Sequence, residues 1–243
     1  MLEHPGVKNK YAIALLALAT FASIALAAPT QEYPLVTPEG LLLHNVQAKP
    51  ATLDNKRGML VTVSEEAKKP RAVAADQPTP FETLAVIEGI DFSNGVIEAE
   101  IAGMPAPGAP EAARGFVGIA FRVKPDLKTY DAFYLRPTNG RADDQVRRNH
   151  SAQYVSHPDW PWSRLRKEAP ERYESYVDLE PGKWTRIRIE VEGDQARFFV
   201  HGQSQPTLVV NDLRSGAQGR GAIALWIDET TVAHFRALRV TPR

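Results

Sequence analysis

The sequence contains no cysteine, carries no net charge and has a single long apolar run. Without cysteine there are no disulfides, no lipid-modified cysteine after a leader and no thiolate metal site. The balance of 29 basic and 29 acidic residues creates no global field that would attract nucleic acid or an anionic membrane. We therefore expect no nucleic-acid partner, and a fold that its core stabilises without covalent links.

The apolar run near the N-terminus predicts an export signal. Lys8 and Lys10 precede it, and it ends at residues 25–27 in the pattern Ala-Leu-Ala, which is typical of a signal-peptide cleavage site. Residues 1–27 are accordingly interpreted as a signal peptide. The alternative is a retained membrane anchor, but about 17 apolar residues are at the short limit for spanning a bilayer. We predict a periplasmic or secreted protein that has no membrane association after cleavage.

The chain after the leader reads as one all-β domain. About 216 residues with a formal charge of about minus one remain, a length that one sandwich commonly fills. Residues 28–40 are Pro-rich and aperiodic, so we predict an extended lead-in without core residues. The domain, residues 41–243, should contain strands at 41–47, 58–63, 83–88, 95–102, 116–123, 131–136, 183–191, 196–201, 207–210, 222–227 and 232–240. This number of strands fits two packed antiparallel sheets, with one short helix at 163–169.

Alternation along several strands separates the sheet face that meets the core from the opposite face. Phe133 is expected to point inward, which sends Tyr134 and Arg136 to the other side. Gly118 and Ala120 also lie on the outer face, where they would leave room for a ligand. The same argument assigns three further side chains to that face: Arg122, Tyr130 and Trp226. The indole of the last would either stack on a sugar or lie covered by a loop.

Residues 137–172 interrupt the succession of strands with little periodicity. A loop of this length inside a compact domain is normally functional or disordered, and this one is too aromatic for a disordered segment. We therefore predict an ordered loop over the outer sheet face that holds the functional site. Its planar polar groups and rings suit the hydroxyls and C–H faces of sugars. The alternative stays open that ion pairs and tryptophan anchors merely pin the loop to the sandwich.

Four segments of the sequence carry a family resemblance. They are 90–98 (Ile-Asp-Phe-Ser-Asn-Gly-Val-Ile-Glu), 118–122, 221–226 and 235–240. Over roughly residues 41–241 this succession resembles the concanavalin A-like lectin/glucanase superfamily, and within it the 3-keto-disaccharide hydrolase domain and laminin G-like modules. The resemblance implies a two-sheet antiparallel jelly-roll sandwich that binds saccharides on its concave sheet or at the rim.

The sequence departs from the superfamily in its carboxylates. Glucanases of this kind carry two catalytic glutamates with an aspartate between them on one strand, in a Glu-x-Asp-x-Glu pattern, and this pattern is missing here. Glu98 and Glu100 share one strand face but have Ala99 between them. Paired carboxylates about 5 Å apart suit a retaining glycosidase, although solvated strand faces carry such pairs routinely.

The candidate site residues come from the outer sheet face, the predicted loop and the segment after it. As catalytic candidates we assign Asp144, His150 and Glu174. The substrate-binding candidates are Arg122, Tyr130, Tyr134, Arg136, Asn139, Arg147, Arg148, Asn149, Gln153, Tyr154, Trp160, Trp162 and Trp226. His150 and His157 raise the alternative of proton transfer or metal binding, although their separation is not a metal-site motif. No cofactor or metal ligand is assigned, and a structural calcium ion is left open.

Three functions compete at this point. The leading hypothesis is an exported carbohydrate-interacting domain with hydrolase-like or lyase-like action on glycosides; 3-keto-glycoside hydrolysis is the activity that the resemblance implies. The alternative is a non-catalytic glycan-binding or adhesion module of the laminin G kind. A third hypothesis is a structural domain whose Arg-rich loop contacts a protein or the cell wall. The expected partner is a saccharide or glycoconjugate, and whether the protein is an enzyme is left open.

Overall fold

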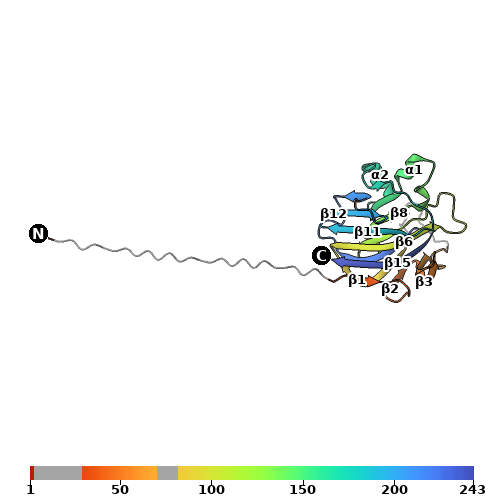
Figure 1. Cartoon of the computed structure of the whole chain (residues 1–243), viewed down its shortest axis with the longest axis horizontal. Helices are drawn as coiled ribbons and strands as arrows, with labels where there is room; N and C mark the ends of the chain where they lie inside the picture. Colours follow the sequence, from red (N-terminus) through yellow and green to blue (C-terminus); the bar gives the residue numbers. More distant parts are fainter. Residues whose placement is uncertain (3–28, 70–81) are drawn as a thin grey trace.

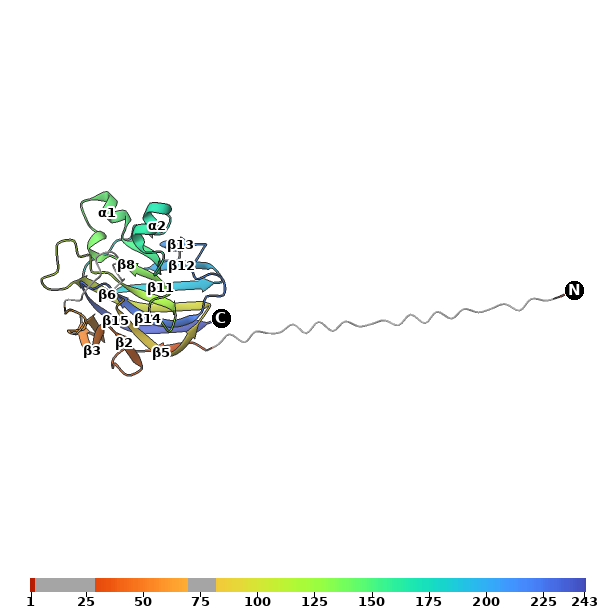
Figure 2. The same ribbon diagram turned by 180° about the vertical axis from the view of Figure 1, so that it is seen from behind.

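The computed structural model describes residues 1–2, 29–69 and 82–243. Two antiparallel sheets pack face to face, and two short helices lie at the end of the sandwich opposite to the first strands (Figure 1 and Figure 2). The predicted signal peptide falls outside the described residues, apart from its first two. In the part of the chain that the structure describes, no helix has the length and apolar character needed to cross a membrane.

Both sheets are antiparallel throughout. The eight-stranded sheet has the order β13 (Leu208–Val210), β12 (Gln195–Val200), β11 (Thr185–Glu192), β6 (Gly95–Pro105), β15 (Thr231–Pro242), β4 (Lys56–Val63) and β3 (Val46–Leu53), and β1 (Gln31–Tyr33) also pairs with β15. The seven-stranded sheet has the order β10 (Glu174–Ser175), β9 (Ala152–His157), β8 (Tyr130–Leu135), β7 (Val117–Val123), β14 (Gly221–Ile227), β5 (Leu84–Phe92) and β2 (Leu41–His44). The helical segments are η1 (Pro137–Asn139), α1 (Gln145–Asn149) and α2 (Trp162–Glu168).

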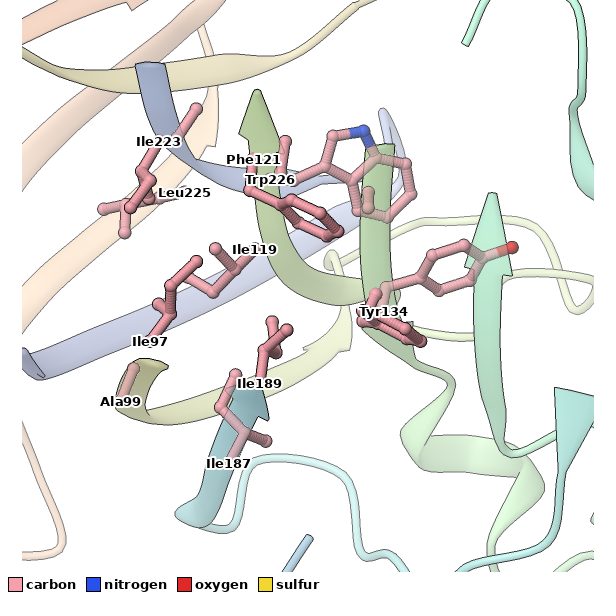
Figure 3. Packing of buried hydrophobic residues seen from close by; sticks show 14 of the residues in the cluster. Ile97, Ala99, Ile119, Phe121, Tyr134, Ile187, Ile189, Ile223, Leu225 and Trp226 are labelled. Atoms are coloured by element: carbon pink, nitrogen blue, oxygen red, sulfur yellow. The ribbon is translucent and has the colours of Figure 1, made fainter. Parts of the chain in front are cut away.

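The core lies between the two sheets, because each strand turns its apolar side chains toward the opposite layer. Ile97 and Ile189 of the eight-stranded sheet face Ile119 of the seven-stranded sheet, as Figure 3 shows. Phe133 of β8 stacks on Phe198 of β12, with ring centroids 5.0 Å apart. Full burial of one such side chain contributes about 1.5–3 kcal/mol, so this interlayer contact holds the sandwich closed.

All eleven predicted strands are present, which confirms the all-β prediction of two packed antiparallel sheets. The predicted strand 41–47 differs in one respect, because it divides at Asn45 into the end of β2 and the start of β3. Asn45 has a φ of +58°, a left-handed conformation that asparagine tolerates better than most residues. The turn there carries the chain from one sheet to the other.

The lead-in at residues 28–40 is more structured than expected. β1 pairs with β15 from Gln31 opposite Val240 to Tyr33 opposite Leu238. Leu35 is only 6 % exposed and belongs to the core. The prediction that this segment contributes nothing to the core is therefore wrong: its pairing with β15 brings Leu35 against the sandwich.

The prediction of an irregular loop at residues 137–172 is also wrong. This segment contains η1, α1, β9 and α2, and β9 pairs along its full length with β8. Only its helix was predicted, at 163–169, and α2 confirms it. β9 escaped notice because it buries the polar side chains of Gln153 and Ser156, so that its sequence lacks the apolar alternation of the other strands.

Candidate functional site

The outer face of the seven-stranded sheet, which points away from the other sheet, carries a buried row of aromatic side chains. Tyr134 and Trp226 both lie beside Gly118 in the strand register and therefore share this face, whereas Phe133 faces the core. Their ring centroids are 4.8 Å apart, and Phe116 stacks on Tyr134 at 5.3 Å. The alternation argument is confirmed for both residues. Their exposed fractions of 1 % and 8 % show that the rings are covered.

The space beside Gly118 is filled by protein. A Cβ atom at this position would lie 2.5 Å from the Cβ atom of Tyr134, so the glycine makes room for the tyrosine and the prediction of a ligand there is wrong. The guanidinium of Arg136 lies over the same ring, 5.3 Å from its centroid, and donates to the Tyr134 hydroxyl at 3.0 Å. The aromatic row thus continues directly into a charged cluster.

Glu174 is the centre of that cluster. Its Oε1 accepts from Arg136 at 3.0 Å, its Oε2 accepts from Nε of Arg166 at 3.0 Å, and Nδ1 of His150 lies 2.9 Å from Oε2. Arg136 also donates to Gln153 at 3.0 Å. The side chains of Arg136 and Glu174 are each 4 % exposed. A buried ion pair this well satisfied holds its members in fixed positions.

The charges and burial of the cluster favour one protonation state each for Glu174 and His150 near neutral pH. Burial disfavours the ionised carboxylate, but hydrogen bonds from Arg166 and Arg136 outweigh burial and lower the pKa of Glu174. Burial lowers the pKa of His150 against the attraction of Glu174, and the positive charges of Arg166 and Arg136 lower it further. The cluster therefore presents an ionised carboxylate beside a neutral imidazole.

A cavity of about 320 Å³ opens beside this cluster, and we call it the His150 cleft. Its lining combines two carboxylates, an amide, an imidazole, a hydroxyl and a phenol ring, from Val146, Asn149, His150, Glu171, Glu174, Ser175 and Tyr176. The cleft lies between α1 with the following residue, His150, on one side and β10 on the other. Three sequence candidates, Asn149, His150 and Glu174, are therefore brought together here.

Two exposed rings flank the cluster. Tyr176 is 42 % exposed, and Arg148 lies 5.1 Å from its ring centroid and donates to its hydroxyl at 2.9 Å. Trp162 is equally exposed, with the guanidinium of Arg166 4.7 Å from its ring centroid. The arginines hold these rings by cation–π contacts, which places apolar surface at the margin of a polar cleft.

A second carboxylate–histidine pair lies at the far end of the aromatic row. The buried Glu82 accepts from the hydroxyl of Tyr130, and Nδ1 of His157 lies 3.1 Å from Glu82 Oε1. Trp226 Nε1 donates to the Tyr130 hydroxyl at 3.0 Å. Burial raises the pKa of Tyr130 well above its ordinary value, and the Glu82 charge adds to the effect. Tyr130 is thus buried in a polar network that spans the sheet.

Asp144, predicted to be catalytic, has a structural position. Its Oδ1 accepts from the backbone N–H groups of Val146 and Arg147 at 2.8 and 3.1 Å, and the carboxylate caps the N-terminus of α1. Caps of this kind typically contribute about 1 kcal/mol. Asp144 is not part of the lining of the His150 cleft, so the structure separates it from His150 and Glu174.

Arg122 is a clamp between loops. Its guanidinium donates to five neighbours, the backbone oxygens of Ser93, Gly193 and Gly216 and the side chains of Asn94 and Ser215. The side chain is 1 % exposed. The guanidinium is therefore engaged by the surrounding loops, although Arg122 also lines a cavity together with Lys124 and Arg214, and its role in substrate binding stays a prediction.

Tyr154 belongs to the interlayer core. It pairs in register with Phe133, and its hydroxyl donates to Asp131 at 2.7 Å while accepting from the backbone N–H of Arg214 at 2.9 Å. The expectation of a saccharide-binding role for Tyr154 is therefore wrong. Asn139 is buried too, and its amide donates to the backbone oxygen of His150 at 3.2 Å, which helps to fix the turn that carries the imidazole.

Several site residues were not found by sequence reasoning. Glu171 lies at the end of residues 137–172 and Tyr176 two positions after Glu174, and neither was assigned a role from the sequence. Arg166 was not singled out because it belongs to a short helix, on which charged side chains are usually exposed to solvent without a specific partner. Glu82 precedes a strand and gave no signal in the sequence. The aromatic side chain of Tyr176, so close to Glu174, is a signal that the sequence does carry.

No metal centre forms within residues 29–69 and 82–243, where no three side chains of His, Asp or Glu come together as potential ligands. His150 and His157 pair with different glutamates. His157 is the last residue of β9, and His150 lies two residues before its first residue, Ala152. The five residue steps from Ala152 to His157 alone span about 17 Å at ~3.4 Å each. The two histidines are thus too far apart to share one ion.

No protein-family model and no curated protein matches the sequence. Among solved structures, a Bacillus subtilis protein of unknown function with a galectin-like fold superposes with a TM-score of 0.50 at 11 % identity, covering 90 % of this chain and 99 % of its own. The carbohydrate-binding module CBM66 from Bacillus subtilis gives 0.49 at 12 % identity, with coverages of 82 % and 97 %. The β-glucanase of Bacillus licheniformis gives 0.46 at 12 % identity, with coverages of 89 % and 99 %.

These similarities concern the fold. The chain has the two-sheet antiparallel jelly-roll fold that the resemblance in the sequence implied. At this level of identity the fold carries no function of its own. The narrower resemblance to the 3-keto-disaccharide hydrolase domain stays a prediction.

Proposed function

We propose that this chain is an exported saccharide-binding protein and that the His150 cleft is its binding site. The observation that supports this most directly is the combination, in one cavity, of the exposed Tyr176 ring with the Asn149 amide and the Glu171 carboxylate. Planar polar groups match the paired hydroxyls of a sugar, and a ring packs on its C–H face. The predicted signal peptide makes an extracellular or periplasmic glycan the accessible partner.

The cleft is also well prepared for binding. Its floor is Glu174, which two arginines fix, and the turn before β9 is held by hydrogen bonds from Arg136 and Asn139 to the backbone oxygen of His150. Side chains that are already ordered lose little conformational entropy when a ligand arrives. A polar ligand with several weak contacts benefits most from such preorganisation.

A glycan array on the chain from residue 28 to 243, with and without a chelator, tests the proposal and identifies a ligand. For that ligand, Tyr176→Ala and Asn149→Ala should each weaken binding about tenfold or more, which corresponds to ~1.4 kcal/mol. Tyr33→Ala removes a ring on β1 of the other sheet and is the matched control. Full affinity in both cleft variants, or an array without any bound glycan, would contradict the proposal.

Glycoside hydrolysis is a second candidate, because His150 and two carboxylates line the same cleft. A neutral His150 is ready to accept a proton, while Glu174 is neutralised by two arginines and so is poorly suited to act as a nucleophile. A broad screen of glycosides, the 3-keto forms included, decides between the two functions. Turnover that disappears in His150→Gln while binding persists would establish an enzyme; binding without product favours a module of the laminin G kind.

A further inference from the structure

A second cavity, of about 340 Å³, opens at the opposite end of β9, and we call it the Trp160 cavity. The residues that matter in its lining are Lys124, Tyr130, His157, Asp159, Trp160 and Arg214. It shares no lining residue with the His150 cleft. The two openings therefore lie on the same sheet but are separate sites.

Two lining residues of the Trp160 cavity, Tyr130 and His157, contact a buried carboxylate that forms no ion pair with a described lysine or arginine. Glu82 is 4 % exposed, and among the described residues its carboxylate oxygens meet only the Tyr130 hydroxyl and Nδ1 of His157. A buried carboxylate costs several kcal/mol unless donors surround it. In its ionised form Glu82 accepts from both partners, and Trp226, which donates to the Tyr130 oxygen at 3.0 Å, fixes the direction of the phenol.

This arrangement selects the tautomer of His157. In a neutral imidazole whose Nδ1–H donates to Glu82, Nε2 is the nitrogen that carries the free lone pair. The imidazole also stacks on the Tyr130 ring, with centroids 5.0 Å apart and planes 10° from parallel. His157 lines the cavity, so a fixed hydrogen-bond acceptor is available to a ligand there.

The turn that carries His157 is rigid. Ser156 and Trp160 exchange two backbone hydrogen bonds, of 3.1 and 2.7 Å, across residues 157–159. The Trp160 ring is contacted by the guanidinium groups of Arg164 at 3.8 Å and Arg214 at 4.2 Å. The exposed Asp159 therefore stands on a closed turn, next to a ring that two arginines hold in place.

The lining contains three basic side chains, of Arg122, Lys124 and Arg214, and the carboxylate of Asp159. Lys124 donates to the backbone oxygen of Arg220 at 2.8 Å and forms no ion pair with a described acid. Arg214 lies 3.5 Å from Asp212, and its Nε is buried without a hydrogen-bond partner among the described residues. Asp159 supplies an opposing negative charge. With Asp131 beside Arg122 and Asp212 beside Arg214, donors and acceptors are both present, without a large excess of one charge that would select an ion.

We propose that the Trp160 cavity is a second, independent binding site for a neutral ligand rich in hydroxyl groups. His157 and Asp159 accept hydrogen bonds from the ligand, and Lys124 and Arg214 donate to it. With the His150 cleft at the other end of β9, the protein is then bivalent and is able to hold two glycan segments at once. The proposal of this second site rests on its own geometry and does not depend on the proposal for the His150 cleft.

Indole signals in ¹H–¹⁵N spectra of the uniformly labelled chain 28–243 test this proposal, because the protein contains four tryptophans. Trp160 reports on the second cavity, and Trp162, which contacts Arg136 and Arg166, reports on the charged cluster around Glu174. Trp184, whose indole donates to a backbone oxygen at 2.9 Å on the other sheet, is the internal control. D-glucose, maltotriose and glycerol are the probes. At least one probe should shift the Trp160 signal saturably while Trp184 stays unmoved.

Variants separate the two sites. The Trp160 shift should persist in Tyr176→Ala and weaken about tenfold in Asp159→Ala, which alters only an exposed turn. His157→Ala should abolish it, provided that the Trp184 signal keeps its native position. A Trp160 signal that no probe moves saturably, or one that responds equally in Asp159→Ala, would overturn the second site. A Trp160 response together with an empty glycan array would overturn the first site alone.

Discussion

The outer faces of the two sheets differ in how far their paired charged side chains are exposed to solvent. On the eight-stranded sheet, Glu100 pairs with Arg236 and Lys56, and these side chains keep 19 to 46 % of their surface in solvent. On the seven-stranded sheet, Arg136 and Glu174 keep only 4 %. Water can solvate the charges on the eight-stranded sheet, whereas the buried charges on the seven-stranded sheet depend on hydrogen bonds from neighbouring side chains.

The buried pair carries a desolvation cost that the fold itself does not require. Exposed ion pairs contribute about 0–1 kcal/mol, and the sandwich would stand without them. Burying Arg136 and Glu174 costs more than a pair of apolar residues would, and the cavity at Glu174 lies beside that pair. Costly burial next to an opening is typical of a functional site. The weak candidate pair Glu98 and Glu100 belongs to the other, solvated face.

The largest expected effect comes from breaking the buried pair. Glu174→Gln leaves two arginines without their counter-charge, so the free energy of unfolding should fall by about 3–5 kcal/mol. The matched change on the other face, Glu100→Gln, should cost less than about 1 kcal/mol. Urea unfolding of both variants measures the difference. Equal losses would mean that the two faces do not differ energetically.

A smaller effect is expected where the aromatic row meets the charged cluster. Tyr134→Phe removes the acceptor of one Arg136 N–H at 3.0 Å, which leaves a buried donor unpaired and should cost about 1–3 kcal/mol. Tyr33→Phe removes a hydroxyl of the exposed face and should stay within about 0.5 kcal/mol. The same unfolding measurement applies, and a Tyr134→Phe variant as stable as the control would show that the network is slack.

The smallest effect is the acid sensitivity that His150 adds, since this side chain is partly open to the cleft. Burial lowers its pKa in the folded protein, so the unfolded chain binds the proton more readily. The contribution is therefore complete above the ordinary value of about 6.5 and is lost as the pH falls through the folded pKa.

Urea unfolding at about pH 7.5 and about pH 5 should thus show a larger loss in the wild type than in His150→Gln. His234 also has a pKa that burial lowers, but it is present in both proteins and cancels in the comparison. A loss of the same size in both proteins would contradict the assignment.

The fold was predictable because most strands obey the alternation of apolar and polar residues. Ile187, Ile189 and Val191 are all buried as that pattern requires. β9 was not predictable on this basis, because its buried Gln153 is satisfied by the backbone oxygen of the adjacent Tyr154 and by two residues distant in sequence, Arg136 and Tyr173. Partners of this kind cannot be read from a local pattern.

The site was predictable in part. The region around residue 150 and the pairing of an outward Tyr134 with Arg136 followed from alternation and from the cluster of aromatic and charged residues. The roles of Asp144, Arg122 and Tyr154 did not, since a helix cap, a loop clamp and a core hydroxyl all use the residue types of a binding site. Only the three-dimensional partners separate these uses.

Hydrogen–deuterium exchange with the array-selected glycan tests the central claim, that ligands bind on the seven-stranded side at the His150 cleft. The account predicts slower exchange on glycan addition in α1, the start of β9 and β10, with no change in β6, β11 and β15. Protection of β6, β11 and β15, with residues 145–176 unaffected, would place the ligand on the opposite sheet and contradict the account.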